Sequence, residues 1–355
     1  MNEILLKTWW WGLEMRDGNP RSDVFSAGDS GELTPETRVL VQRRSVATRQ
    51  LLENLSARGL SQIVNAMLLL RNGGWGETDL ELLQALGERA LEIADSFDFH
   101  QASFMLAVLT SLEDLKYGAE LWYAMQHRAA KTAGTCDMRA LSALFDTLET
   151  RRKKFPVLPV LLDASCKRAS AFVDNLLPRR LGPLLLSLAN LGAVPCSELV
   201  TAVTRYVEEK ASLFWPVDIA DLLVAFARMR AEISPSLATV LQGQVLNFAK
   251  TIGAQDLLRI VWALAARRAH THPDFVEAVW ARALVLAPIF QPQQCANLLR
   301  AAAMLDLKPP QALVATLEVC VQLFLSSLGR FSPSLGRGCA WMTNCLRACV
   351  RRHAS

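Results

Sequence analysis

Apolar residues recur at helical spacing along most of this chain. From Leu60 onward they fall at positions i, i+3, i+4 and i+7, the pattern of amphipathic helices that pack on a core. Alternating apolar and polar runs, which are typical of strands, are almost absent, and the chain contains only 3 Tyr. The pattern therefore predicts an all-α fold.

The helical pattern itself repeats along the chain. One apolar motif returns with a small residue at a fixed position, and that residue is Ala189, Ala227, Ala265 and Ala303, 38 residues apart each time. Looser copies place Leu68, Thr110, Asp146 and Asn344 at the same position. In such repeats each helical pair buries its apolar face against its neighbours. We expect an α-solenoid of about eight helix-turn-helix repeats of roughly 38 residues. We also expect the small residues to let adjacent helices approach closely.

Each repeat is predicted to hold two helices joined by a short loop with Pro or small polar residues. The clearest first helices are predicted at residues 217–229 and 254–268, and second helices at 197–212, 236–251, 273–286 and 311–325. Residues 17–35 are rich in Gly, Ser, Asp and Pro, and Thr34-Pro35-Glu36 has the residue types that begin a helix. This divides the chain into an N-terminal extension and linker at 1–34 and a helical-repeat array at 35–355.

Charge is distributed unevenly between the two halves. Residues 1–175 carry 20 basic and 23 acidic side chains, whereas residues 176–355 carry 18 basic and 11 acidic ones. The basic half contains only three lysines, so its charge is mostly arginine, whose planar fork suits phosphate. A nucleic-acid partner and a solvated or protein-binding face both fit this imbalance. No run of about 18 uncharged apolar residues occurs, so we expect no membrane span.

The repeat resembles a known group of sequences. Residues Ile260-Val261-Trp262-Ala263-Leu264-Ala265 match most closely the octotricopeptide and heptatricopeptide repeats of organellar RNA-binding proteins, and FAST-kinase-like mitochondrial proteins share a similar pattern. The resemblance covers about residues 60–350. It implies binding of organellar RNA, and some members of these families are built into mitochondrial ribosomes. Many members carry a C-terminal RAP domain, which we do not expect here because the last repeat runs to the end of the chain.

Candidate RNA-binding residues are cations that recur once per repeat on one face. Three residues after the small position stand Arg71, Arg230, Arg268 and Arg347. Denser basic runs add Arg151, Arg152, Lys153, Lys154, Arg267, Arg351 and Arg352, and Arg179-Arg180 forms a further pair. The alternative is that helix C-termini favour cations through the helix dipole and that the runs are solvated turns. Both interpretations stay open.

Aromatic and metal-ligating residues give weaker indications. Trp262 and Phe226 lie near the centre of the motif and are expected in the core. Trp75 is either an exposed stacking residue or a loop anchor, and the cluster Trp9–Trp11 either docks onto a partner protein or packs on the first repeat. Eight cysteines form no CxxC pair and are expected to be reduced, buried side chains. The C-terminal group Cys339, Cys345, Cys349 and His353 is expected to pack between helices, with zinc as the alternative. His270-Thr271-His272 is expected to be a polar loop.

No enzyme motif is present, neither a phosphate-binding glycine loop nor a zinc-protease or nucleophile signature. We therefore expect no catalysis, no cofactor, no metal and no small-molecule substrate. The sequence favours a non-catalytic organellar RNA-binding protein, in mitochondria or alternatively in plastids. Its most concrete form is a structural subunit of a ribonucleoprotein such as the mitochondrial ribosome, in contact with ribosomal RNA and neighbouring subunits. The alternatives are a protein-binding scaffold without RNA contact and a free RNA-stability factor.

Overall fold

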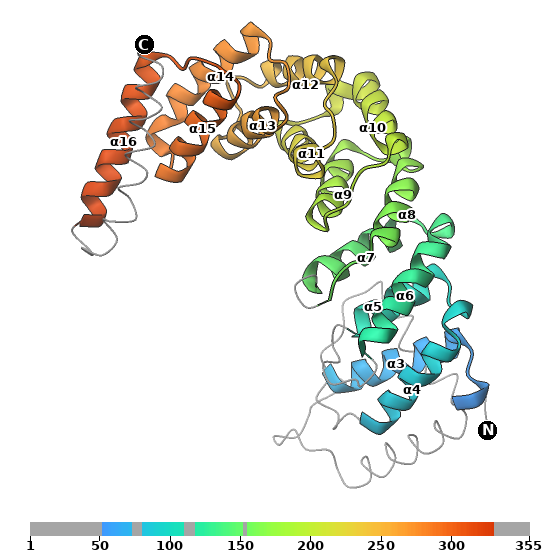
Figure 1. Cartoon of the computed structure of the whole chain (residues 1–355). Coiled ribbons are helices and arrows are strands. Elements are labelled where there is room, and N and C mark those ends of the chain that lie inside the picture. The colour runs from blue at the N-terminus through green and yellow to red at the C-terminus, as the bar shows by residue number, and fades with distance from the viewer. Residues whose placement is uncertain (1–51, 73–79, 110–117, 152–154, 330–355) are drawn as a thin grey trace, which may run out of the picture.

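Every element of the computed structural model is helical over the residues it describes, which are 52–72, 80–109, 118–151 and 155–329. Fourteen α-helices and six short 3-10 helices follow one another in this part of the chain, without a strand (Figure 1). The predicted all-α fold is confirmed.

The helices alternate between two series. The odd-numbered helices are α3 (Ala57–Asn72), α5 (Phe99–Leu109), α7 (Met138–Arg151), α9 (Pro178–Asn190), α11 (Pro216–Met229), α13 (Ala254–Arg267) and α15 (Pro292–Met304). The even-numbered helices are α4 (Leu80–Glu92), α6 (Gly118–Thr132), α8 (Pro159–Ser170), α10 (Ser197–Lys210), α12 (Pro235–Asn247), α14 (Pro273–Leu286) and α16 (Gln311–Gly329). The even helices from α8 to α16 begin 38 residues apart each time, so the predicted period holds in this region.

Proline sets many of the helix starts. Six of the helices from α8 to α15 have Pro at their first position, where the missing N–H costs no intrahelical bond. The residue before each of these prolines is extended, as proline requires of its neighbour. These starts repeat in register, and they fix where each helical pair begins.

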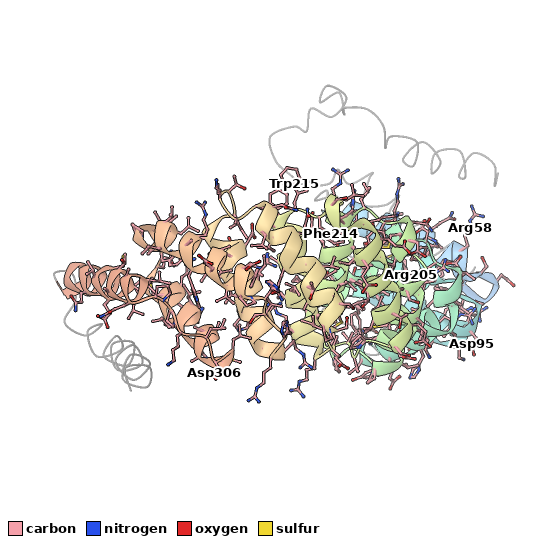
Figure 2. The ribbon with its side chains drawn as sticks, turned by 90° about the horizontal axis from the view of Figure 1, so that it is seen from above. Arg58, Asp95, Arg205, Phe214, Trp215 and Asp306 are labelled. Carbon is pink, nitrogen blue, oxygen red and sulfur yellow. The ribbon has the colours of Figure 1, made fainter. Side chains whose placement is uncertain are left out.

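Consecutive odd helices pack on one another, and so do consecutive even helices, which makes a two-layer arch. From α5 to α15 the odd helices line the inner side of the arch and the even helices lie on its outer side (Figure 1). A continuous series of buried apolar side chains runs between the layers. Seen from above, the loops that precede and follow the odd helices lie at opposite edges, marked by Trp215 and Asp306 (Figure 2).

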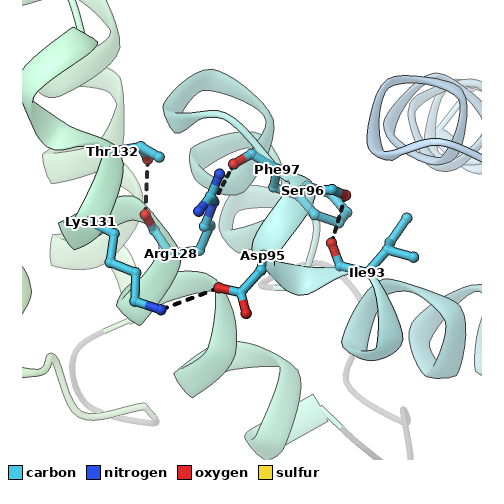
Figure 3. Close-up of polar contacts among 7 residues, drawn as sticks. All are labelled: Ile93, Asp95, Ser96, Phe97, Arg128, Lys131 and Thr132. Atoms are coloured by element: carbon cyan, nitrogen blue, oxygen red, sulfur yellow. Dashed lines mark hydrogen bonds and ion pairs between the residues drawn. The ribbon is translucent and has the colours of Figure 1, made fainter.

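Side chains on the even helices bond back to the start of the same helical pair. Arg168, Tyr206, Gln244 and Arg282 are 38 residues apart, and each donates to the carbonyl two residues before an odd helix. The Nε atoms of Arg168 and Arg282 both lie 2.9 Å from their acceptors, the carbonyls of Cys136 and Ile252. Arg128 donates in the same way to Phe97, beside an ion pair of 3.2 Å between Lys131 and Asp95 (Figure 3). These hairpin-closing donors satisfy carbonyls that would otherwise be buried without a partner.

The helix boundaries correct several sequence expectations. The predicted helix 273–286 is observed as α14, but the helix predicted to end at residue 251 ends at Asn247. The helix predicted for 254–268 ends at Arg267, because Arg268 takes a left-handed conformation with φ 48°. The placement of Asp146 at the small position is wrong: counted from the helix start, Glu149 is the equivalent of Ala189.

One close helix–helix approach lies at a residue that the repeat motif did not single out. A Cβ atom added to Gly182 in α9 would lie 2.7 Å from the Cβ of Asp221 and 3.4 Å from the carbonyl oxygen of Asp218 in α11. Only a glycine allows this approach without a shift of the helices.

Seven helical pairs lie in the described part of the chain. The predicted extension at 1–34, the helix start near Pro35 and the repeat around Asn344 lie outside it. No described helix combines the length and apolar character that crossing a bilayer requires.

Candidate nucleic-acid interface

Four odd helices end in the same hydrogen-bonded motif. At the end of α11 the N–H of Arg230 donates to the carbonyl of Ala227 (3.3 Å), and that of Ala231 donates to the carbonyl of Phe226 (2.9 Å). This pair of bonds is a Schellman motif, which needs one residue in the left-handed conformation. The same two bonds end α9, α13 and α15, and the left-handed residues are Gly192, Arg230, Arg268 and Asp306.

The motif explains the period found in the sequence. The recurring small residues Ala189, Ala227, Ala265 and Ala303 supply the carbonyl that accepts the N–H of the left-handed residue. The position three residues later is therefore the left-handed position itself, at the edge of the arch marked by Asp306 (Figure 2). The predicted row of rim cations coincides with a backbone position that favours glycine.

Arginine occupies this position in two successive repeats. Arg230 (φ 58°) and Arg268 (φ 48°) are exposed, and in the described part of the chain neither guanidinium has a hydrogen-bond or ion-pair partner. A residue with a Cβ atom in this conformation costs roughly 1–2 kcal/mol. Both arginines thus present charge to solvent from a strained backbone.

Two further arginines flank them, and we call Arg228, Arg230, Arg267 and Arg268 the arginine rim. Arg228 is exposed and donates to the side chain of Asn190 on α9. Arg267 is half-buried, and its Nε donates to the carbonyl of Ala231 (2.9 Å). Arg267 therefore holds the loop after α11, a structural role that the prediction of an RNA contact did not include.

The other predicted cations are spread along the chain. Arg71 lies within α3, not after its end, and Arg151 is the last residue of α7. Arg152, Lys153, Lys154, Arg347, Arg351 and Arg352 lie outside the described residues, as do Trp75, Trp9–Trp11 and the group Cys339, Cys345, Cys349 and His353. Of the predicted cations in the described part of the chain, the structure brings together Arg230, Arg267 and Arg268, and it adds Arg228, which the sequence analysis did not single out.

On the inner face between α11 and α13, the basic side chain is paired with acidic ones. Arg259 pairs with Asp221 on the neighbouring helix and lies 3.9 Å from Asp256 on its own. Burial raises the pKa of Asp218 and of Asp256 above the usual range of a carboxyl group. The three carboxyl groups of Asp218, Asp221 and Asp256 outnumber the one arginine, so this stretch of the inner face is poorly suited to phosphate.

Between α7 and α9 the inner face is hollowed. A groove of about 540 Å³ lies there, and Arg139 and Asp146 of α7 and Arg180 of α9 are among its lining residues. The sequence indicated only Arg180, through its pair with Arg179. The groove depends on the unequal packing of odd helices, for which the repeat pattern carries no signal.

The two central aromatic residues differ in burial. Phe226 is fully buried, as expected, but Trp262 is 38% exposed, so the expectation that it lies in the core is wrong. At the edge of the arch opposite the arginine rim, Trp215 is 64% exposed (Figure 2). Its ring packs on that of Phe248, with the ring centroids 5.4 Å apart. Leu213, beside it, is also exposed.

Within the described residues no group of three or more His, Cys, Asp and Glu side chains is placed to hold a metal ion. His270 and His272 lie in the loop before α14, where the main chain of both bonds to the side chain of Gln242. This loop is polar, as the sequence indicated. Comparison with protein-family models and with curated protein sequences finds no match for this chain. The resemblance to organellar repeat proteins therefore stays a prediction.

Proposed function

We propose that this protein binds single-stranded RNA along its helical arch without catalysing a reaction on it. The arginine rim contacts the phosphate backbone, and the inner face of the odd helices lies beside the strand. The resemblance of the repeat to organellar RNA-binding families supports a place in a mitochondrial, or alternatively plastid, ribonucleoprotein. The mitochondrial ribosome, with ribosomal RNA and neighbouring subunits as partners, is the most concrete form of the proposal.

The observation that carries the proposal is arginine at two left-handed positions. A helix C-terminus is stabilised by a cation, but by only about 0.3–1 kcal/mol at an exposed site. The backbone strain of roughly 1–2 kcal/mol exceeds that gain. Contact with a charged ligand would account for arginine at Arg230 and Arg268, which the fold alone does not favour.

The test removes the charges of Arg230 and Arg268 by substituting a residue that, like arginine, has a Cβ atom and therefore a similar preference for backbone conformation. The Arg230→Gln/Arg268→Gln variant of the full chain is titrated into a fluorescently labelled single-stranded RNA at several salt concentrations. Each phosphate contact contributes about 0.7 to the slope of log K against log salt, so the slope should fall by about 1.4. At 0.1 M salt this is a loss of affinity of about 25-fold.

A matched variant controls for net charge. Lys131 and Arg205 are exposed, lie on even helices and pair with Asp95 and Asp174. The Lys131→Gln/Arg205→Gln variant loses the same charge and should leave the salt slope unchanged. An equal fall in both variants, or in neither, would show that the arginine rim does not contact RNA.

The place in a ribonucleoprotein needs a separate measurement. The protein is crosslinked in cells, attached RNA is sequenced, and the lysate is sedimented with and without ribonuclease. Ribosomal RNA crosslinks in a ribosome-sized fraction would support the structural role. A single messenger site in a light fraction would favour an RNA-stability factor instead.

A second candidate function, a protein-binding scaffold, is favoured by the exposed apolar side chains around Trp215. Large exposed aromatic residues are enriched at protein interfaces. A complex that survives ribonuclease and is lost on Trp215→Ser substitution, with no RNA attached to the protein, would favour the scaffold over RNA binding.

A further inference from the structure

A groove lies between α7 and α9 on the inner face, where the two helices contribute all but one of its lining residues. At the next junction Gly182 brings α9 close against α11. The contact between α7 and α9 is the least extensive among consecutive odd helices in the described chain. The groove's volume of about 540 Å³ lies within the range of about 300–1,000 Å³ for pockets that take small molecules.

The walls and floor of the groove differ in chemistry. The floor is apolar, with the buried side chains of Phe145 and Leu184. Ser142 and Ser187, one from each helix, supply half-exposed hydroxyl groups. An apolar slot with hydroxyl groups on both sides suits a flat ring with polar edges.

One end of the groove attracts an anion. Arg139 and Arg180 line it from the first turns of α7 and α9, and both side chains are exposed. Leu177, at the N-cap of α9, gives its helix no side-chain cap, and the first turn contains no acidic residue. Two guanidinium groups beside an uncapped helix N-terminus favour phosphate.

The other end of the groove carries a negative charge. Asp146 lies seven residues after Arg139 on α7, about 10 Å farther along the helix axis. This spacing is of the order of a nucleotide's length from its phosphate to the outer edge of its base. A carboxylate has only acceptor oxygens, and guanine is the base that offers it two adjacent donors, N1–H and the N2 amino group.

We propose that this groove binds one guanosine monophosphate unit, with its phosphate between Arg139 and Arg180 and its base edge on Asp146. The unit is either part of the RNA strand, in which case the inference rests on the proposed function, or a free nucleotide. The apolar floor holds the face of the base, and the serine hydroxyls bond the sugar.

The test uses the full chain with two probes. Binding of 5′-GMP and of 5′-AMP is measured by calorimetry. Two 12-nucleotide RNAs that differ in a single G or A then compete with the labelled RNA used above for binding to the protein. We expect about tenfold tighter binding of the guanine probe in one or both formats, the preference that one two-bond base contact supplies. The Asp146→Asn variant should reduce this preference to about one, because the amide presents a donor to guanine.

The control is Asp163→Asn, the same change at an exposed carboxylate on α8 that pairs with Lys167. It should leave the guanine preference intact. Guanine preference in 5′-GMP alone identifies a free nucleotide, and preference only within the RNA identifies a unit of the strand. Absence of guanine preference in both formats, or a preference unaffected by Asp146→Asn, overturns the groove assignment. RNA binding that is absent while 5′-GMP still binds refutes the proposed function and leaves the groove standing.

Discussion

Replacing Arg230 and Arg268 by glycine should make the protein more stable. Both residues have positive φ, a conformation that costs a side chain with a Cβ atom roughly 1–2 kcal/mol. Glycine removes this strain but adds about 0.5–1 kcal/mol of backbone entropy to the unfolded chain. At high salt, which screens the favourable interaction of the two cations with the helix dipoles, the net gain is about 0.5–1 kcal/mol for each site and about 1–2 kcal/mol for both.

The gain is measurable by urea unfolding, followed by circular dichroism. With an m value of about 3 kcal/mol per molar urea, the midpoint of the double variant should rise by about 0.5 M. Amide hydrogen exchange gives a local readout, because the N–H groups of Ala231 and Ala269 close the two motifs and should become better protected.

Two other residues at the same backbone position are internal controls. Gly192→Ala should lower stability by about 1 kcal/mol, since it introduces the strain that the arginine variants remove. Asp306→Gly should stabilise less, because aspartate tolerates the left-handed conformation better than arginine does. A lower midpoint for the double glycine variant would refute the reasoning, because contacts of the arginine side chains would then outweigh the strain.

Three further substitutions or reactions test the packing. Gly182→Ala should destabilise the protein by about 1–3 kcal/mol in urea unfolding, since its Cβ would clash with α11. Arg282→Met should cost about 1–3 kcal/mol in the same assay, because the carbonyl of Ile252 is left buried without its donor. Cys166 and Cys295 should resist alkylation at pH 8 in the native protein, as read by mass spectrometry, because burial raises their pKa to about 12 and about 11.

The arginine and cysteine predictions each have a comparison that separates the stated cause from a general effect. Arg205→Met removes an arginine that is exposed on an even helix, and it should change stability by no more than about 0.5 kcal/mol. Both cysteines should react fully once urea unfolds the chain. Rapid alkylation in the native protein, or equal losses for Arg282→Met and Arg205→Met, would contradict the burial described here.

The fold was largely predictable because recurring residues mark where the helices of each repeat begin and end. Alanine at Ala189, Ala227, Ala265 and Ala303 marks the end of four helices, and proline marks the starts of many others. In the repeat of α7 these markers are missing, and the predicted small position, Asp146, lies three residues before the observed one, Glu149. The position of that repeat could be corrected only once the start of α7 was known.

The candidate sites were less predictable, for two physical reasons. Arginine gives no sign of positive φ, so the strain at Arg230 and Arg268 was invisible, although Gly192 at the equivalent position was a hint. The groove depends on how far α7 lies from α9, which arises from tertiary packing. Its polar lining residues also lie on α7 and α9, and the repeat of α9 matches the sequence motif much better than that of α7 does.

The limited contact between α7 and α9 has a mechanical consequence. A stacked array bends most readily where its neighbouring elements share the least surface, and in the inner layer of the described arch that place is the junction of α7 and α9, near its middle. We expect the inner side of the arch to open or close more easily here than between the other odd helices, so a ligand bound in the groove should alter the span between the two ends of the arch.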